Sequence, residues 1–224
     1  MEYWERDEVV REFAARAPDH RLLELIERYA DPRAVRVLDI GCAAGRNTVL
    51  LAERGFDVHA LDASAAMVAE TRRRLGPILG EREAAARVQC RRMSDLERYP
   101  SASFDLAVAL GVLHAAASGR EWHRSAAGIA RVLRPAGMLL VAAFTPDTDL
   151  TGEGLRPVAG EAHVFEGLPG GRATLLYPDE LDAALGEHGF TTELLTSTGT
   201  TITERGRRVS ANGLYRSGTA QRPT

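Results

Sequence analysis

The sequence predicts an α/β fold built on a mostly parallel sheet. Five short apolar runs alternate with stretches of helical periodicity, an order typical of strand–helix–strand units. The first run, Val35 to Ile40, is largely apolar and ends at Gly41, which indicates a strand buried on both faces of a parallel sheet. The other four predicted strands cover residues 57–61, 87–93, 104–110 and 138–144.

Helical patterns and turn signals account for most of the remaining chain. Residues 5–30 carry apolar side chains at helical spacing, and Pro18 divides them into two amphipathic helices. Further helices are expected at 45–54, 64–75, 122–133 and 178–187, with Gly76-Pro77 breaking the second of these. Pro135 and Gly137 predict a turn before the fifth strand. Two extended runs at 191–203 and 207–215 predict a C-terminal hairpin.

Two stretches lack a regular pattern. Residues 145–175 are rich in glycine and show little periodicity, so that an insertion that forms a lid and a plain surface excursion are both compatible with the composition. Residues 217–224 are polar and are expected to form a disordered tail. We therefore expect one domain over residues 1–216.

The composition excludes several classes of partner. The net charge is −3, which gives no general attraction to nucleic acid or to anionic membranes. No apolar run approaches the ~20 residues that span a bilayer, and the charged N-terminus is unlike a signal peptide. The two cysteines, Cys42 and Cys90, lack the spacing of a metal site. We expect a cytoplasmic protein, monomeric or homodimeric, with no bound metal.

A glycine-rich turn joins the first predicted strand to the next helix. Small residues between Gly41 and Gly45 let the backbone turn tightly and approach a ligand, and the helix N-terminus offers N–H groups to an anion. Asp62 lies 21 residues after Gly41, where an acid in a doubly wound sheet can accept bonds from ribose hydroxyls. Alternatively, the glycines only shape the turn and Asp62 caps the following helix.

The spacing of this turn disfavours a nicotinamide dinucleotide. A dinucleotide loop reads Gly-x-Gly-x-x-Gly, whereas counting from Gly41 places Ala43 and Arg46 at the second and third glycine positions. A P-loop is excluded because no Gly-Lys-Ser/Thr is present. A cofactor that combines an amino acid, a positive charge and an adenosine suits a loop of small residues with acids nearby.

Five blocks, in order and at matching spacing, resemble the class I, Rossmann-like S-adenosylmethionine (SAM)-dependent methyltransferases over about residues 10–145. They are residues 37–45, 60–62, 93–96, 103–114 and 133–139. The resemblance implies a doubly wound, mostly parallel seven-stranded sheet with a C-terminal antiparallel hairpin and N-terminal helices, and SAM as the cofactor. The segment 45–52 is most similar to the tellurite-resistance-type branch and its small-molecule relatives. Ala43 departs from the family, which has glycine there, by one methyl group.

The resemblance also implies roles for individual residues. Asp62 would bind the ribose hydroxyls, Asp95 would meet the adenine edge, and the backbone at Leu110 and Gly111 would accept a bond from the methionyl ammonium. Asp39 would act on that charge indirectly. The cofactor-binding residues expected in full are Asp39, Gly41, Cys42, Ala43, Arg46, Asn47, Asp62, Ala63, Ser94, Asp95, Leu96, Leu110 and Gly111.

Methyl transfer from a sulfonium mainly requires positioning, so no catalytic triad is needed and none is evident. His114 follows the fourth predicted strand, at the edge where α/β sites form, and is the catalytic candidate as a base or a substrate contact. The alternative is that it packs or caps a turn. Tyr3 and Trp4 either cover the sulfonium through cation–π attraction or anchor the N-terminus on the core. Residues 1–31 and 145–175 are expected to form a lid over the acceptor.

We therefore expect a SAM-dependent methyltransferase that acts on a small molecule. A nucleic-acid or protein methyltransferase is the alternative, against which stand the acidic charge and the lack of a basic, aromatic-laced stripe. A SAM-binding protein with a non-methylating role is a further alternative. A nicotinamide oxidoreductase is disfavoured by Ala43 and Arg46.

Overall fold

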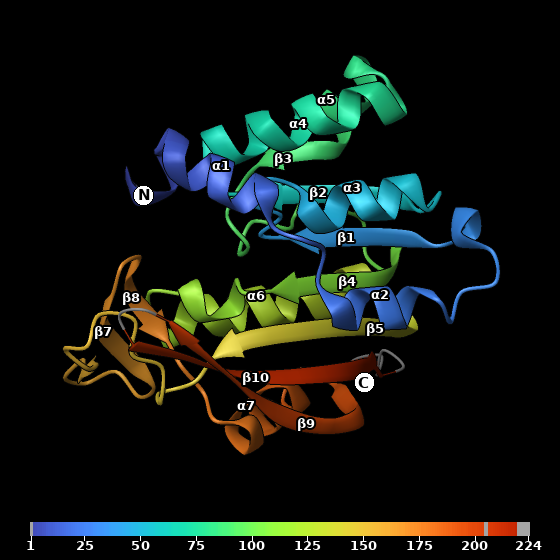
Figure 1. The fold of residues 1–224 in the computed structure, drawn as a ribbon. Helices are drawn as coiled ribbons and strands as arrows, with labels where there is room; N and C mark the ends of the chain where they lie inside the picture. Colours follow the sequence, from blue (N-terminus) through green and yellow to red (C-terminus); the bar gives the residue numbers. More distant parts are fainter. Residues whose placement is uncertain (1, 204–205, 219–224) are drawn as a thin grey trace. The chain divides into compact units, whose positions relative to one another are not determined.

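The structure is a computed structural model that describes residues 2–203 and 206–218 (Figure 1). In this part of the chain, seven strands hydrogen-bond in the order β3-β2-β1-β4-β5-β10-β9, and a second sheet has the order β6-β7-β8. β3, β2, β1 and β4 are parallel, whereas β10 is antiparallel to both β5 and β9. The expected sheet with its C-terminal antiparallel hairpin and N-terminal helices is confirmed.

The chain forms two compact units. The first comprises the residues up to 93 together with 104–108, and the second comprises 94–103 and the chain from 109 onward. The extent of a single domain, expected over 1–216, stays a prediction.

The first unit is built on parallel strands whose side chains are buried. Val37 of β1 is in register with Val58 of β2 on one side and with Leu106 of β4 on the other, and all three are fully buried. Its elements are η1 (Glu2–Glu5), α1 (Asp7–Ala15), α2 (His20–Ile26), η2 (Pro32–Ala34), β1 (Arg36–Ile40), α3 (Arg46–Glu53), β2 (Asp57–Asp62), α4 (Ala65–Leu79), α5 (Glu81–Arg87), β3 (Val88–Cys90) and the start of β4 (Phe104–Leu110).

The second unit carries the long antiparallel strands. A buried polar cluster fastens α7 to β9 and β10, because the Asp182 carboxylate accepts hydrogen bonds from Thr196 at 2.6 Å and from Tyr215 at 2.7 Å. The elements of this unit are η3 (Leu113–Ala115), α6 (Gly119–Val132), β5 (Leu133–Phe144), β6 (Arg156–Pro157), β7 (Val164–Leu168), β8 (Gly171–Thr174), α7 (Pro178–Gly186), β9 (Phe190–Thr203) and β10 (Gly206–Ser217).

The helix break predicted at Gly76-Pro77 is wrong. Helix α4 continues through Pro77 and ends before Gly80, whose φ is +86°. Pro77 lacks the N–H that would bond to the carbonyl four residues earlier, and the helix continues to Leu79 despite the loss of this one bond. A separate helix, α5, then runs to Arg87, so the third strand begins at Val88 and ends at Cys90 instead of covering 87–93.

Three further expectations need correction. The extended chain of β5 begins at Leu133, earlier than expected, and the predicted turn at Pro135 and Gly137 lies within it, where Ala136 has a left-handed φ of +64°. The segment 145–175 contains the three-stranded sheet β6-β7-β8 and is more regular than its composition indicated. Ser217 belongs to β10, and the Gly218 N–H donates to the Gly189 carbonyl at 2.8 Å, so the expected tail does not begin at 217. Residues 219–224 lie outside the described residues.

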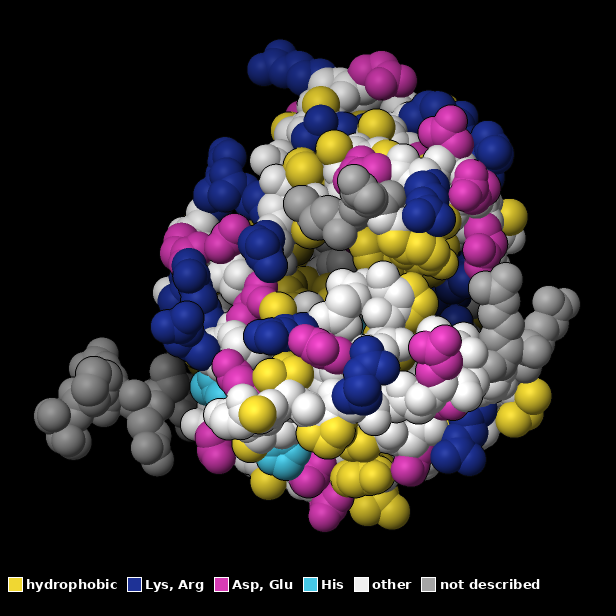
Figure 2. All heavy atoms as spheres, turned by 90° about the vertical axis from the view of Figure 1, so that its left-hand side faces the viewer, with side chains coloured by type: hydrophobic (Ala, Val, Ile, Leu, Met, Phe, Trp, Pro, Cys, Tyr) yellow, Lys and Arg dark blue, Asp and Glu magenta, His cyan; other side chains and the backbone are white. Residues whose placement is uncertain are grey.

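No helix among the described residues is long and apolar enough to cross a bilayer. On the face shown in Figure 2, arginines and acidic side chains are interspersed, and no broad patch of one sign is visible.

Candidate functional site

The turn between β1 and α3 has a left-handed backbone at alternate residues. Gly41, Ala43 and Gly45 have φ values of +71°, +46° and +82°. The N–H groups of Gly41 and Cys42 both donate to the Leu61 carbonyl of β2, at 2.8 and 3.0 Å. A Cβ on Gly45 would lie 2.8 Å from the Thr71 side chain of α4, so glycine is required there for close packing as well as for its φ.

Asp62 at the end of β2 is held beside this turn. One carboxylate oxygen accepts the Ala43 N–H at 2.9 Å and the other accepts the Ser64 N–H at 2.9 Å. A carboxylate has about four lone-pair sites, more than these two bonds use, so it retains capacity for a further donor. Burial raises the pKa of Asp62, and the N–H groups of Ser64, Ala43 and Ala63 oppose that rise. The structure thus brings Asp62 and the glycine turn together, as expected from their spacing.

Asp39 and Cys42 lie beneath the surface of the turn. The Asp39 carboxylate is only 2% exposed and accepts a hydrogen bond from Thr48 of α3 at 2.6 Å. Burial raises its pKa to about 6, while the Thr48 hydroxyl and the Arg46 charge lower it. Cys42 is also buried, and burial raises the pKa of its thiol. Within this unit, Asp39 can act on a ligand through its charge, as the resemblance implied.

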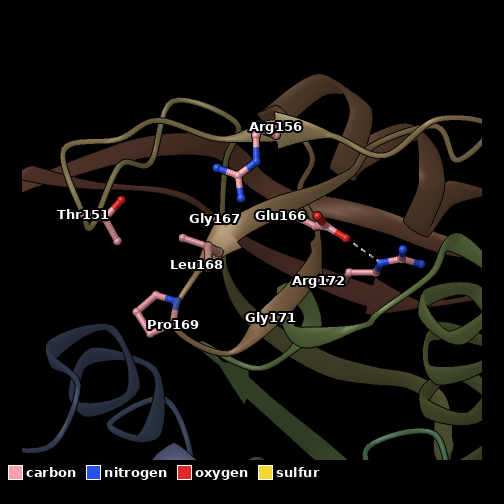
Figure 3. Close-up of a pocket in the computed structure, with 8 residues that line it drawn as sticks. All are labelled: Thr151, Arg156, Glu166, Gly167, Leu168, Pro169, Gly171 and Arg172. Carbon is pink, nitrogen blue, oxygen red and sulfur yellow. Dashed lines mark hydrogen bonds and ion pairs between the residues drawn. The ribbon is translucent and has the colours of Figure 1, made fainter.

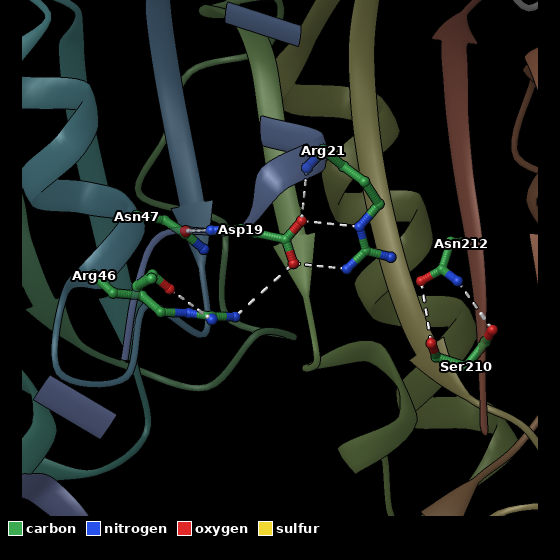
Figure 4. A network of polar contacts seen from close by, with 7 residues as sticks. Asp19, Arg21, Arg46, Asn47, Ser210 and Asn212 are labelled. Carbon is green, nitrogen blue, oxygen red and sulfur yellow. Dashed lines mark hydrogen bonds and ion pairs between the residues drawn. The ribbon is translucent and has the colours of Figure 1, made fainter. Parts of the chain in front are cut away.

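Arg46 and Asn47 contact the linker between α1 and α2 with their side chains (Figure 4). The Arg46 guanidinium donates to the Ala17 carbonyl at 3.0 Å and lies 4.0 Å from the Asp19 carboxylate. The Asn47 side-chain oxygen accepts the Asp19 N–H at 3.0 Å, and Arg21 pairs with the same carboxylate at 2.6 Å. These two predicted cofactor residues therefore hold the N-terminal segment through their side chains.

A second set of contacts ties η1 to the start of α4. The Glu5 carboxylate accepts the N–H groups of Ala65 and Ala66 at 3.0 and 3.1 Å, and these bonds lower its pKa, Ala66 most strongly. The Ser64 hydroxyl donates to the Trp4 carbonyl at 3.1 Å. Sequence reasoning missed Glu5, because nothing in the local pattern marks an acid that caps a helix 60 residues further along.

Tyr3 and Trp4 belong to an apolar cluster on the glycine turn. Their rings are in edge contact at 4.9 Å, and Trp4 makes a similar contact with Phe13 at 5.4 Å. The cluster consists of Val9, Ala44 and Met67, with Tyr3, Trp4, Val10, Phe13, Ala14 and Ala43 packed against them. Of the two alternatives left open, anchoring of the N-terminus is the one that these contacts support.

In the second unit, Ser94, Asp95 and Leu96 lie on a loop that α6 holds in place. Arg131 of α6 donates to the Leu96 carbonyl at 2.8 Å, and Leu96 packs on Gly128, where a Cβ would be 3.3 Å away. The Asp95 carboxylate is partly exposed and lies 3.7 Å from Arg124. Asp95 is therefore accessible to a ligand, while Ser94 and Leu96 are buried.

The end of β4 places Leu110, Gly111 and His114 in the second unit. Gly111 has a φ of +87°, and its N–H donates to the Ala142 carbonyl at 2.7 Å. His114 is buried and stacked on Phe144, with ring centroids 3.9 Å apart. Its Nδ1 accepts the Phe144 N–H at 3.2 Å.

The environment of His114 sets its protonation. Burial, with a smaller contribution from Arg208, lowers its pKa to about 3. The ring is therefore neutral near pH 7, and because Nδ1 accepts a hydrogen bond, Nε2 carries the proton. In this arrangement His114 offers a donor, and its one lone pair is already used. The role of base is disfavoured on this geometry, and a contact with the substrate stays a prediction.

Residues 37–137 match the family model of a methyltransferase domain. The match assigns residues 37–137 to a methyltransferase domain. The expected family and enzyme class are thereby confirmed, whereas nothing in the comparisons bears on the tellurite-resistance-type branch. No curated protein sequence matches the chain.

Three solved structures similar to the chain are themselves methyltransferases. A SAM-dependent methyltransferase from Methanosarcina mazei is 20% identical over 87% of this chain and 97% of its own, with a TM-score of 0.66. The 1,6-didemethyltoxoflavin-N1-methyltransferase of Burkholderia thailandensis, with its substrate and S-adenosylhomocysteine (SAH) bound, is 21% identical over 96% and 81%, with a TM-score of 0.62.

The magnesium protoporphyrin IX methyltransferase of Synechocystis, with SAM bound, is 18% identical over 88% of this chain and 76% of its own, with a TM-score of 0.59. At such identities the likeness establishes the fold. Together with the domain match, the bound SAM and SAH of these neighbours support SAM as the cofactor that the glycine turn and Asp62 predicted.

Proposed function

We propose that the protein transfers the methyl group of SAM to a small-molecule acceptor. The observation that carries the proposal is Asp62, which two backbone N–H groups at 2.9 Å hold at the carboxyl end of β2. The lone-pair capacity that these bonds leave suits a ribose hydroxyl. An acid at this position of an α/β sheet supports a nucleoside cofactor.

The turn itself favours SAM over a dinucleotide. Close packing against α4 is achieved by Gly45, one residue before the third position of a dinucleotide loop. Arg46 occupies that position, and its side chain is directed to the Ala17 carbonyl. The remaining predicted residues are proposed to hold the methionyl and adenosyl parts: Gly41, Cys42, Ala43, Ala63, Asp95, Leu110 and Gly111.

In the proposed mechanism SAM supplies an electrophilic methyl group, and the protein positions the acceptor in line with it. Holding two reactants at near-attack distance contributes ~7–11 kcal/mol to such reactions. His114 would orient the acceptor through the Nε2–H donor. Residues 1–31 and 145–175 would close over the acceptor as a lid and exclude water. The proposed partner is a small molecule only, and the proposed setting is the cytoplasm, as a monomer or homodimer.

Two measurements test the proposal. Calorimetry should show binding of SAM and SAH and no binding of NAD; binding of NAD without SAM would refute it. Incubation of the protein and SAM with a small-molecule extract should then give a product heavier by about 14 Da, the mass of a methyl group in place of a hydrogen. If SAM binds but neither SAH nor a heavier product forms, the non-methylating alternative holds instead.

The lid is tested by hydrogen exchange. Backbone amides in residues 2–26 and 145–175 should exchange more slowly when SAH is bound and more slowly again when the acceptor is added. The buried strands β1 and β5 serve as internal controls, since their amides should be protected in all states. Equal exchange of the two segments with and without ligands would leave the N-terminal helices and the insertion as fixed parts of the fold.

A further inference from the structure

A hollow of about 470 Å³ lies on the small sheet β6-β7-β8. It is lined by Thr151, Arg156, Glu166, Gly167, Leu168, Pro169, Gly171 and Arg172 (Figure 3). Two of these side chains are cationic and one is acidic, so the lining carries a net charge of about +1 near neutral pH. An aliphatic side chain and a proline ring form its apolar part.

The acid of this hollow is committed to one of the two arginines. Arg156 and Glu166 are directly opposite each other in the β6-β7 register. Nevertheless, the Glu166 carboxylate pairs with Arg172, at 3.0 Å. Figure 3 shows the Arg156 guanidinium pointing away from that pair, towards Gly167 and Leu168. Within residues 2–203 and 206–218, the ion pairs found leave Arg156 without a carboxylate partner.

The walls of the hollow are fixed by the backbone. Gly167 has a φ of +118°, and a Cβ there would lie 2.8 Å from the Gly154 carbonyl oxygen, so the loop before β6 packs directly on the bulge in β7. The Asp149 carboxylate accepts the N–H groups of Thr151 and Gly152 at 3.1 and 2.8 Å. Arg156 and Thr151 therefore face the hollow from segments with a defined geometry.

The small sheet is fastened to the part of the second unit that carries His114. The Thr174 hydroxyl at the end of β8 donates to the Ala116 carbonyl, just after η3, at 2.9 Å, and this contact is buried. On its other side, Asp149 exchanges two backbone hydrogen bonds with Arg207 of β10, at 2.9 and 2.7 Å. The hollow is thus part of the same unit as the proposed acceptor contact.

We infer that this hollow binds the anionic group, a carboxylate or a phosphate, of the methyl acceptor. The inference rests on the proposed function for the identity of the acceptor. A guanidinium presents its donors in a planar fork that matches both anions, and Arg156 has its fork uncommitted to an acid. Leu168 and Pro169 provide an apolar surface for the body of the same molecule.

The test uses benzoate and inorganic phosphate as probes, with chloride at equal ionic strength as the reference. The NMR signal of the Arg156 Nε–Hε group is identified as the one that the Arg156→Gln variant lacks. In the wild-type protein this signal should shift saturably as either probe is added. Arg156→Gln should weaken probe binding by about tenfold or more, because a charge-assisted bidentate contact is lost. Glu166→Gln should tighten it, because the hollow then loses its negative charge. Arg124→Gln is the matched control, since Arg124 pairs with Glu97 at 2.7 Å outside the hollow.

Each outcome has a defined meaning. Saturation by benzoate alone assigns a carboxylate, saturation by phosphate alone assigns a phosphate ester, and saturation by both assigns a site for either anion. No saturable shift, or an equal loss of binding in Arg124→Gln, overturns the inference. Calorimetry with SAH distinguishes a failure of this inference from a failure of the proposed function. If SAH binds but neither probe does, only the role of the hollow is wrong. If the probes bind but SAH does not, the methyltransferase proposal fails and an anion site remains.

Discussion

Replacing Asp62 by alanine should reduce both stability and cofactor affinity. In the absence of ligand, the carboxylate accepts two backbone hydrogen bonds at 2.9 Å, from Ala43 and Ser64. Hydrogen bonds to a charged group contribute ~1.5–3 kcal/mol each. Removal of the buried charge, whose pKa burial raises, offsets part of that loss. We expect the free energy of unfolding to fall by about 2–4 kcal/mol.

Affinity for SAM should fall by roughly 10- to 150-fold, because the ribose loses a charged acceptor worth ~1.5–3 kcal/mol. Urea unfolding and calorimetry with SAH measure the two effects on the same protein. Ser64→Ala is the matched control: it removes the hydroxyl that accepts the Met67 N–H at 3.2 Å and donates to the Trp4 carbonyl at 3.1 Å. This should cost ~1 kcal/mol of stability and leave SAH affinity close to that of the wild type. A loss of stability in Asp62→Ala with unchanged SAH affinity would show that Asp62 is a structural cap only.

Three further predictions concern buried polar groups. Folding raises the pKa of Asp39 from 3.8 to about 6. The stability that this shift contributes is therefore fully present below pH 4 and is lost as the pH rises through 6. In urea titrations, the free energy of unfolding of Asp39→Asn should gain about 3 kcal/mol on that of the wild type between those pH values. Folding lowers the pKa of His114 from 6.5 to about 3, so its contribution to stability is present above pH 6.5 and is lost on acidification. The NMR resonances of its ring nitrogens should show a neutral ring protonated at Nε2 throughout pH 5–8. A titration near pH 6.5 would contradict the assignment. Tyr215→Phe removes a 2.7 Å hydrogen bond to the Asp182 carboxylate and should lower the free energy of unfolding by ~1.5–3 kcal/mol, while an unchanged unfolding midpoint would show that the bond contributes nothing.

The hydrophobic pattern and the turn residues of the sequence predicted those helices and strands that depend mainly on neighbouring residues. The fourth strand has the predicted bounds, Phe104–Leu110, because an apolar run between polar turns leaves one way to bury it. The contact between Asp62 and the glycine turn also followed from spacing, since the ends of adjacent parallel strands meet at one edge. Pro77 misled because the loss of one backbone hydrogen bond did not end the helix, which continues to Leu79.

Other features depend on contacts that no local pattern encodes. β6 has two residues, and the register of β7 shifts between Phe165 and Leu168, so the alternation that marks a strand is interrupted. The state of His114 depends on the N–H of a residue 30 positions later. The roles of Arg46 and Asn47 in holding the N-terminal segment required knowledge of where Ala17 and Asp19 lie.

The composition of the first unit has a consequence for the order in which it forms during synthesis. Its last strand, residues 104–108, is made only after residues 94–103, which belong to the second unit. Until β4 emerges, β1 lacks the neighbour that pairs with Val37, and the Arg36 N–H lacks the Asp105 carboxylate that accepts it at 2.8 Å. A fragment that stops at residue 93 leaves that edge open to other chains, so the shortest fragment that contains every strand of the first unit extends to the end of β4.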